Sequence, residues 1–446
     1  MLLSTLKNWN QLTPAQILAS GYFTVIVIGT ILLMLPIATP DGQGLGFINS
    51  LFTATSATCV TGLIVVNTST AFTVFGQVVI LVLIQIGGLG LMTMSTLAAL
   101  ILGKKIGLRS RLIILEDLNQ MNISGIVRLV SYVLGFTLII QGAGALLLFL
   151  RLVSDYSVLD ALYKAIFHAI SAFNNAGFDI FGNSLESFTG DIAVNFIIIG
   201  LIVLGGIGFG VLVEMYNKRK LNQLSLQSKI VLITTVILLI AGFVGIFILE
   251  YSNMATMGQL NLGETALASF FLSVTPRTAG FNTVPTGGLT PPALFFVIIL
   301  MFIGASPGST GGGIKTTTFG VMLITVWNML RGREDLEIAN RRLKREVVLK
   351  AISIAMLAAG LIILVTIVLS VIEEAEFLDI LFETVSAFGT VGLSTGVTPT
   401  LSMVGRILII ITMFVGRVGP LTLGTAFAER ELRGDYHYPP EEVMVG

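Results

Sequence analysis

The stretch SAFNNAGF at residues 171–178 has three counterparts elsewhere in the chain. They read SATCVTGL at 56–63, VTPRTAGF at 274–281 and SAFGTVGL at 386–393. Each ends in a glycine followed by a large apolar residue, and these glycines recur at intervals of 115, 103 and 112 residues. The four glycines are Gly62, Gly177, Gly280 and Gly392. Similarity at such regular intervals indicates a chain built from four copies of one structural unit.

The surroundings of each motif also repeat. A short apolar stretch precedes every copy, and it is too short to cross a bilayer. These stretches are residues 46–57, 158–172, 263–274 and 376–387. A weaker glycine motif follows each copy, and its first glycine lies 24 to 28 residues past the glycine of that copy: IGGLG at 86–90, LGGIG at 204–208, IGASPG at 303–308 and VGRVG at 415–419. The predicted unit is therefore a helix, a re-entrant half-helix, a glycine-bearing loop and a second helix.

Composition places these units in a membrane. Hydrophobic residues make up 54% of the 446 residues and charged residues only 11%, which is far from the range of soluble proteins. Long apolar stretches of the kind that span bilayers occupy residues 17–35, 78–102, 129–150, 193–213, 230–249, 292–330, 347–371 and 407–427. We expect an all-α integral membrane protein with eight spans, four re-entrant loops and pseudo-symmetric repeats at 1–104, 105–218, 219–332 and 333–446.

The distribution of charge predicts the topology. Most of the 25 Lys and Arg residues lie in the segments 104–128, 218–229 and 331–350, which follow every second span, and near both ends of the chain. The positive-inside rule makes this face cytoplasmic. We therefore expect a multi-pass protein of the plasma (inner) membrane with both termini in the cytoplasm. The opposite face carries many acidic residues, which either attract cations or simply solvate the outer loops. The lone Cys59 excludes an internal disulfide.

Four re-entrant loops at membrane depth predict a pore. Non-helical backbone is tolerated inside a bilayer only where protein buries it or where it lines a watery cavity. A half-helix entering from outside directs its partly negative C-terminal end towards the membrane centre, which favours a cation. The loops that follow can replace the hydration shell of the cation with backbone carbonyls, and the glycine permits the positive φ that this needs. The sequence thus predicts a pathway for monovalent cations around one axis.

The strings HAISAFNNAGF, VTPRTAGFN, SAFGTVGLSTG and GRVGPLT resemble the Trk/Ktr/HKT superfamily of potassium transporters, closest to the bacterial Ktr-type membrane subunit, over essentially the whole chain. The resemblance implies a potassium-channel-like pore with the four glycines in its selectivity filter. The residues assigned to this filter, whose carbonyls would hold potassium, are Thr58, Cys59, Val60, Thr61, Gly62, Asn174, Asn175, Ala176, Gly177, Arg277, Thr278, Ala279, Gly280, Gly389, Thr390, Val391 and Gly392. A serine in the first filter is associated with sodium preference in this family, and Gly62 favours potassium. None of the loops carries TVGYG, so we expect a filter with fewer well-formed sites and a less strict exclusion of sodium.

The resemblance also implies partners. Members of this kind are homodimers that sit on a cytosolic ring of nucleotide-binding regulatory subunits. The chain itself has no dinucleotide fingerprint, so regulation by ATP or ADP would come from that ring, and no covalent cofactor or nucleic acid is expected. The bilayer is the remaining partner.

GASPGSTGGGIKT at 304–316 interrupts an apolar span with five glycines and a proline, residues that weaken or end a helix. The resemblance implies that this loop gates permeation below the filter. A kink for close helix packing is the simpler structural interpretation. The residues assigned to the gate are Gly304, Ala305, Ser306, Pro307, Gly308, Ser309, Thr310, Gly311, Gly312, Gly313, Lys315 and Arg417.

Three basic residues in or near the membrane have separate predictions. Arg417, a cation within a span, is expected to face the loop carbonyls. Lys315 is expected either to snorkel or to pair with a glutamate or loop carbonyls. Arg277 is expected behind the third filter loop, bonded to backbone or to a carboxylate such as Glu264 or Glu383.

Three other functions fit less well. A phosphate-binding P-loop requires a glycine directly before its lysine, whereas Ile314 separates Gly313 from Lys315. An intramembrane protease would use Ser306 with His168, for which no third polar group is apparent. A sodium-coupled or sodium-permeable symporter is the serious rival, but such transporters commonly consist of inverted halves, whereas all four units here run in one direction.

Overall fold

The computed structural model describes residues 13–91, 93–94, 96, 107–117, 126–332, 337–338 and 341–427. The described chain is almost entirely helical. Two short strands, β1 (Glu337–Ile338) and β2 (Arg341–Arg342), pair antiparallel between the third and fourth units. Both ends of the chain and the segment 97–106 lie outside the described residues, so the predicted placement of the termini and the predicted topology stay predictions.

A long helix followed by a short one occurs four times. The long helices are α2 (Pro14–Leu33), α8 (Ile126–Leu152), α12 (Leu226–Glu250) and α16 (Arg345–Ile372). The short helices are α3 (Phe47–Thr58), α9 (Val158–Phe173), α13 (Leu262–Val274) and α17 (Phe377–Gly389). Each short helix packs against the long helix before it. The four predicted half-helices are therefore confirmed as helices, each within a few residues of its expected position.

Local chemistry fixes where these helices begin. Thr13 and Gln16 form a reciprocal capping box at the start of α2, and Asn261 and Glu264 do the same at α13. The Ser157 hydroxyl accepts the backbone N–H of Asp160 at the start of α9. Such caps satisfy the N–H groups that the first turn of a helix leaves without partners.

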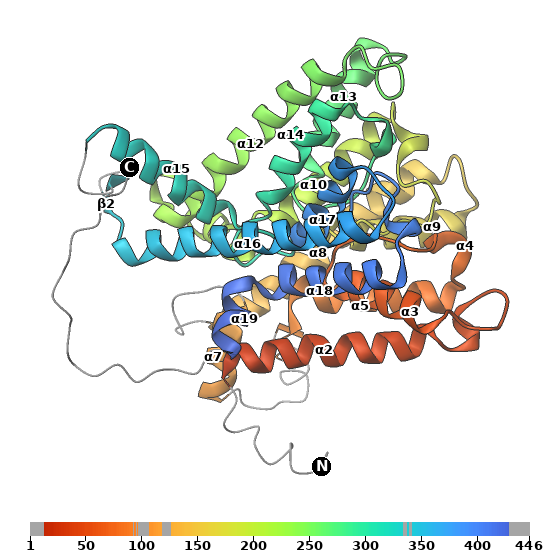
Figure 1. The fold of residues 1–446 in the computed structure, drawn as a ribbon, viewed down its shortest axis with the longest axis horizontal. Coiled ribbons are helices and arrows are strands. Elements are labelled where there is room, and N and C mark those ends of the chain that lie inside the picture. The colour runs from red at the N-terminus through yellow and green to blue at the C-terminus, as the bar shows by residue number, and fades with distance from the viewer. Residues whose placement is uncertain are drawn as a thin grey trace.

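The second helices of the units are α5 (Val74–Leu89), α10 (Ile192–Gly206), α14 (Pro291–Phe302) and α18 (Met403–Val418). Three of them are followed by α11 (Phe209–Lys218), α15 (Thr316–Leu330) and α19 (Pro420–Phe427). The other α-helices given for the described residues are the short α4 (Thr68–Ala71) and α7 (Leu108–Asp117). Figure 1 shows α19 turning away from the axis of α18 towards α2.

The predicted continuous spans at 193–213 and 407–427 are wrong. Gly208 separates α10 from α11 at a bend of 95°, and Gly419 separates α18 from α19. Both glycines adopt positive φ, +100° and +95°, as does Gly90 at the end of α5 with +85°. A residue in this conformation leaves the helical region, which is why the helix stops. The interruption predicted in the third unit is confirmed, since residues 303–315 form a loop between α14 and α15.

Four of the described helices, α2, α8, α12 and α16, are each long and apolar enough to cross a bilayer, or five segments if α10 and α11 count as one span. The total of eight spans stays a prediction, because the second helix of each unit is too short by itself. The long helices expose apolar side chains such as Leu138, Ile237 and Leu364. An apolar outer face of this extent is typical of contact with lipid.

The half-helices occupy the centre of the molecule. Six of the largest fully buried side chains are phenylalanines of α3, α9, α13 and α17: Phe52, Phe167, Phe173, Phe271, Phe382 and Phe388. The long helices lie around them and expose much of their own surface (Figure 1). This arrangement buries the loops that follow the half-helices.

Candidate functional site

The four repeated glycines meet in a closed cycle. A methyl group added to Gly62 would lie 2.5 Å from the carbonyl oxygen of Ala176, and one added to Gly177 would lie 2.9 Å from that of Ala279. A methyl group on Gly280 would lie 2.5 Å from the carbonyl oxygen of Val391, and one on Gly392 would lie 2.2 Å from that of Thr61. Because Thr61 belongs to the first loop, the four contacts form a closed cycle. Each loop thus presents the carbonyl before its glycine to the glycine of the preceding loop, and the first loop presents its carbonyl to the glycine of the fourth. A side chain at any of these positions would force the neighbouring carbonyl to move.

Each loop contains a second residue with positive φ, two positions before its glycine. These residues are Val60 (+57°), Asn175 (+59°), Thr278 (+71°) and Thr390 (+50°). The left-handed conformation is costly for residues other than glycine, most of all for β-branched ones, and it persists where the surroundings enforce it. The same alternation in four loops of different sequence indicates that the backbone direction matters more than the side chains.

The half-helices end at this cycle. Thr58 is the last residue of α3 and Cys59 caps it, while Asn174 caps α9 and Gly389 closes α17. The partly negative C-terminal ends of these helices therefore come close to the carbonyls of the loops. The buried hydroxyls of Thr58, Thr61 and Thr390 have no hydrogen-bond partner within the described chain. The amide of Asn175 lies 3.3 Å from Thr278 Oγ1.

Three further glycines, absent from the predicted site, hold the second helices against the half-helices. A methyl group on Gly87, Gly205 or Gly416 would lie 1.9 to 2.0 Å from a carbonyl oxygen at the end of the half-helix of the same unit. Those oxygens belong to Thr58, Phe173 and Phe388, each four residues before its cycle glycine. The weaker glycine motif is the sequence signal for these positions. The sequence does not show what the glycines contact, because the half-helix end that they touch lies more than 25 residues earlier in the chain.

The loop 303–315 is bonded to the break between α10 and α11. Ser306 N donates to Gly206 O at 3.0 Å, and Phe209 N donates to Gly308 O at 2.8 Å. Thr310 N donates to Gly205 O at 3.2 Å, and its hydroxyl donates to Phe173 O at the end of α9. The groups that both broken helices leave unsatisfied therefore satisfy one another, as buried backbone requires.

The same loop lies directly against the cycle. A methyl group on Gly311 would lie 2.0 Å from Thr278 Oγ1, and one on Gly312 would lie 2.4 Å from Thr390 Oγ1. Ala305 N donates to Gly312 O and so closes the loop on itself. The loop therefore lies against the third and fourth loops of the cycle, which follow α13 and α17.

Arg417 and Lys315 both bind backbone carbonyls. Arg417 donates from Nη1 to Thr310 O and from Nη2 to Gly87 O, which links the loop to α5. Lys315 Nζ donates to Gly311 O at 2.8 Å. Of the partners predicted for Lys315, the loop carbonyls are the ones that the structure provides.

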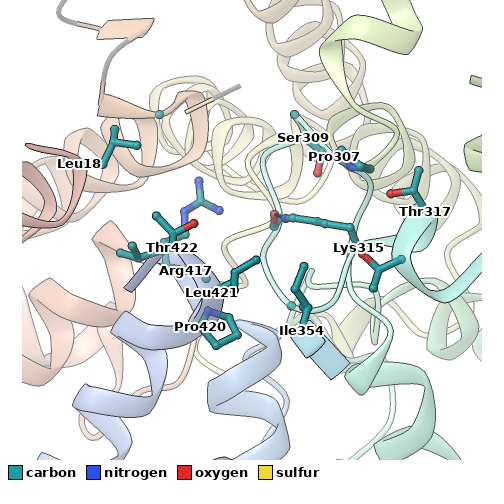
Figure 2. A pocket seen from close by; sticks show the side chains of 18 of the residues that line it. Leu18, Pro307, Ser309, Lys315, Thr317, Ile354, Arg417, Pro420, Leu421 and Thr422 are labelled. Atoms are coloured by element: carbon teal, nitrogen blue, oxygen red, sulfur yellow. Dashed lines mark hydrogen bonds between the residues drawn. The ribbon is translucent and has the colours of Figure 1, made fainter. Parts of the chain in front are cut away.

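A cavity of about 380 Å³ lies beside these two residues. Figure 2 shows Arg417 of α18 and Lys315 of the loop on different sides of it. The described residues that line it include Lys315, Lys350 and Arg417 and no acidic side chain. Gly90 and Gly419, at the ends of α5 and α18, also line the cavity, as does Gly308 of the loop. The cavity therefore adjoins the points at which these helices stop.

Arg277 lies behind its loop, but its partner is not a carboxylate. Its Nη2 donates to Thr235 Oγ1 on α12 at 3.2 Å. Glu264 belongs to the cap of α13, and Glu383 accepts bonds from residues that follow the fourth loop. Both predicted carboxylate partners are therefore wrong, because each is already committed to donors closer in sequence.

The protease pair does not form. The Ser306 hydroxyl accepts from Thr316 Oγ1 at 3.0 Å, whereas His168 contacts Lys164 O and Ile180 N. Lys315 is likewise bound to loop carbonyls rather than held free for a phosphate. The geometry gives no support to either enzymatic alternative.

A family model for cation transport proteins, TrkH, matches residues 4–433, nearly the full chain. The chain belongs to the TrkH family. This TrkH-family protein is 47% identical over 439 residues to the Ktr system potassium uptake protein B of Bacillus subtilis, with 98% of each chain covered. It is 38% identical over 442 residues to the potassium/sodium uptake protein NtpJ of Enterococcus hirae, again with 98% of each covered.

The fold also has a solved counterpart. The TrkH-family protein matches the crystal structure of the potassium transporter TrkH from Vibrio parahaemolyticus with a TM-score of 0.70. The match covers 92% of this chain and 85% of that one at 16% identity. Together with the apolar helices, family membership identifies a multi-pass membrane protein of the Trk/Ktr superfamily whose relatives are transporters rather than enzymes.

Proposed function

We propose that this TrkH-family protein takes up potassium as the ion-conducting subunit of a Ktr-type system. The observation that carries the proposal is the closed cycle of Gly62, Gly177, Gly280 and Gly392, in which each loop offers a carbonyl towards its neighbour. Carbonyl oxygens held around one axis replace the water that a monovalent cation loses, and the half-helix ends add favourable potential. The names of the Bacillus relative and of the Vibrio structure agree with this function.

In this proposal the residues assigned from the sequence form the selectivity filter, and the loop 303–315 is the gate. Gly311 and Gly312 lie against the threonines of two filter loops, so the loop stands in the path that an ion would take on leaving the filter. Arg417 holds the loop through Thr310 O and adds a positive charge beside that path. Opening would require the release of these bonds and of those to the helix break at Gly208.

A second candidate is a sodium-permeable or sodium-coupled transporter of the same fold. It is favoured by the 38% identity to a relative named a potassium/sodium uptake protein. Each loop here has one glycine in a short motif rather than TVGYG, and fewer fixed carbonyls discriminate less strongly between ions. The two candidates share the pathway and differ only in how strictly it excludes sodium.

The assembly and placement are also proposals. We infer a homodimer in the plasma membrane, with both termini in the cytoplasm and a nucleotide-binding ring on that face. The naming of relatives as parts of a Ktr system supports the need for a further component. ATP and ADP would then act only through the ring. The division into repeats at 1–104, 105–218, 219–332 and 333–446 completes the proposal.

Growth of a bacterial host that lacks its own potassium uptake systems tests this function. Expression of the protein is expected to restore growth at submillimolar potassium, more strongly when a ring subunit of a Ktr system is expressed with it. Potassium content measured by flame photometry checks that the ion has entered. Growth that is restored only when sodium is high would favour the second candidate. If no ring subunit allows the protein to restore growth, potassium uptake is refuted.

Alanine at Gly208 is expected to raise the rate of potassium uptake. Its methyl group would lie 2.6 Å from Pro307 O, at a φ of +100° that alanine rarely adopts. The break between α10 and α11 must shift, which weakens the bond from Phe209 N to Gly308 O. Uptake of rubidium, compared at equal protein in the membrane, measures the effect.

Gly332→Ala is the matched control, because Gly332 also has positive φ, +64°, with no atom within 4 Å of the added methyl group. We expect wild-type uptake from it. Equal rates for Gly208→Ala and the wild type would show that the contact does not restrain the loop.

A further inference from the structure

Two units hold their loops from the same position of the half-helix. His168 of α9 lies nine residues before Gly177, and Glu383 of α17 lies nine residues before Gly392. His168 Nε2 accepts from Ile180 N at 3.4 Å, and Glu383 Oε1 accepts from Thr395 N at 2.9 Å. Ile180 and Thr395 each follow their glycine by three residues. The two side chains are therefore structural equivalents that tie the outer part of a loop to its half-helix.

The histidine makes this tie without charge. Its Nδ1 lies 2.7 Å from the carbonyl of Lys164, which only accepts, so Nδ1 carries the proton and Nε2 is free to accept from Ile180 N. The ring is 1% exposed and stacks on Phe181 with centroids 4.0 Å apart. A neutral side chain is therefore sufficient to hold a loop at this position.

The glutamate makes the tie with a carboxylate. Glu383 is 1% exposed and accepts from Ser394 Oγ at 2.5 Å, Thr395 N and Thr398 Oγ1. None of the ion pairs among the described residues includes it. Burial of a carboxylate without a cationic partner is costly, even when hydroxyl and N–H donors surround it. His168, the equivalent residue of the second unit, forms the same tie without a charge. The tie alone therefore does not explain why a carboxylate is buried at Glu383.

The location of the Glu383 carboxylate explains why it is charged. The three donors belong to residues 394–398, which begin two residues after Gly392, so the carboxylate lies beside the outer part of the fourth loop. Arg406, the basic residue bound to this segment, donates to Pro399 O rather than to the carboxylate. Under the proposed function, a cation held by the loop carbonyls is a positive charge beside this part of the loop that can offset the carboxylate. The corresponding positions of the other two units are Thr53 and Phe271, so Glu383 makes the cycle electrostatically asymmetric.

We propose that Glu383 is a positioning residue of the fourth loop whose buried negative charge sets the affinity for the permeating cation. This inference rests on the proposed function. The tie to Ser394, Thr395 and Thr398 holds the loop, and the charge strengthens binding of a monovalent cation at the outer part of the filter. His168 provides only the tie in the second unit.

Glu383→Gln tests the charge, because glutamine keeps one accepting oxygen. We expect the KM for potassium uptake to rise about tenfold, the usual scale for loss of one charge near a bound ion, with Vmax within about twofold of the wild type. Thr398→Val removes one donor of the tie and keeps the charge, so its KM is expected to rise less than that of Glu383→Gln. Glu250→Gln is the matched control, since Glu250 is fully buried and accepts from Thr290 N and Oγ1 at the start of α14 rather than from a residue of the four loops.

A wild-type KM in Glu383→Gln, or an equal rise in Thr398→Val or Glu250→Gln, would overturn the role of the charge. Thermal unfolding of the purified proteins in potassium and in choline gives a second measurement that needs no transport. Bound potassium raises the Tm of the wild type, and we expect a smaller rise for Glu383→Gln. An equal rise would contradict the proposal. Absence of uptake by the wild type would instead refute the proposed function.

Discussion

Replacement of Arg417 by alanine is expected to raise the rate of potassium uptake several-fold. The guanidinium joins Thr310 O of the loop to Gly87 O of α5, so one side chain holds the loop to a helix of another unit. Hydrogen bonds from a charged donor each contribute about 1.5 to 3 kcal/mol, and the substitution removes two together with a positive charge beside the path. Rubidium flux into proteoliposomes measures the rate.

Arg417→Lys keeps the charge but offers no planar fork, so an intermediate rate is expected. Deletion of residues 306–311 removes the loop itself and should act in the same direction as Arg417→Ala. Arg406→Ala is the control on the same helix, since Arg406 binds Asn49 and Pro399 O at the start of α18. Unchanged flux in both Arg417→Ala and the deletion would discard the gating role of the loop.

Serine at Gly62 is expected to lower the preference for potassium over sodium by about tenfold. Its Cβ would lie 2.5 Å from Ala176 O, at a φ of +93° that serine rarely adopts. The neighbouring carbonyl must turn away, which removes one of the four oxygens of the cycle. Loss of one well-placed ligand is worth about 1.4 kcal/mol or more, or a factor of ten in relative affinity. Competition of sodium with rubidium uptake gives the preference directly.

Gly42→Ser provides the comparison for this variant. Gly42 has φ +66°, so serine is strained there too, but no atom lies within 4 Å of the added Cβ. Backbone strain alone should leave the ion preference as in the wild type. If Gly62→Ser keeps the wild-type preference, the first loop does not belong to the filter.

Thr310 connects the parts that these experiments address. Its N–H reaches α10, its hydroxyl reaches the end of α9, and its carbonyl accepts from Arg417. A shift of the loop therefore changes contacts at a half-helix and at two second helices together. The proposed gate requires the loop to exchange this set of bonds for another one.

Much of the architecture was predictable from local patterns. Four motifs at regular intervals gave the repeating unit, and short apolar stretches gave the half-helices, because these features depend on nearest neighbours along the chain. The loop at 303–315 was predictable for the same reason, since proline and glycines weaken a helix wherever they occur. The breaks at Gly208 and Gly419 were missed because a single glycine in an apolar run is compatible with a continuous helix, and only the contact with another unit decides otherwise.

The sequence by itself determined the membrane class, the four units and the four repeated glycines, since composition and spacing are properties of the chain alone. Only the tertiary structure decided which atoms meet: the order of the cycle, the partners of Arg417 and Arg277, and the equivalence of His168 and Glu383. Those contacts join residues a hundred or more positions apart or lie between loops and helices, so they depend on how the four units pack together.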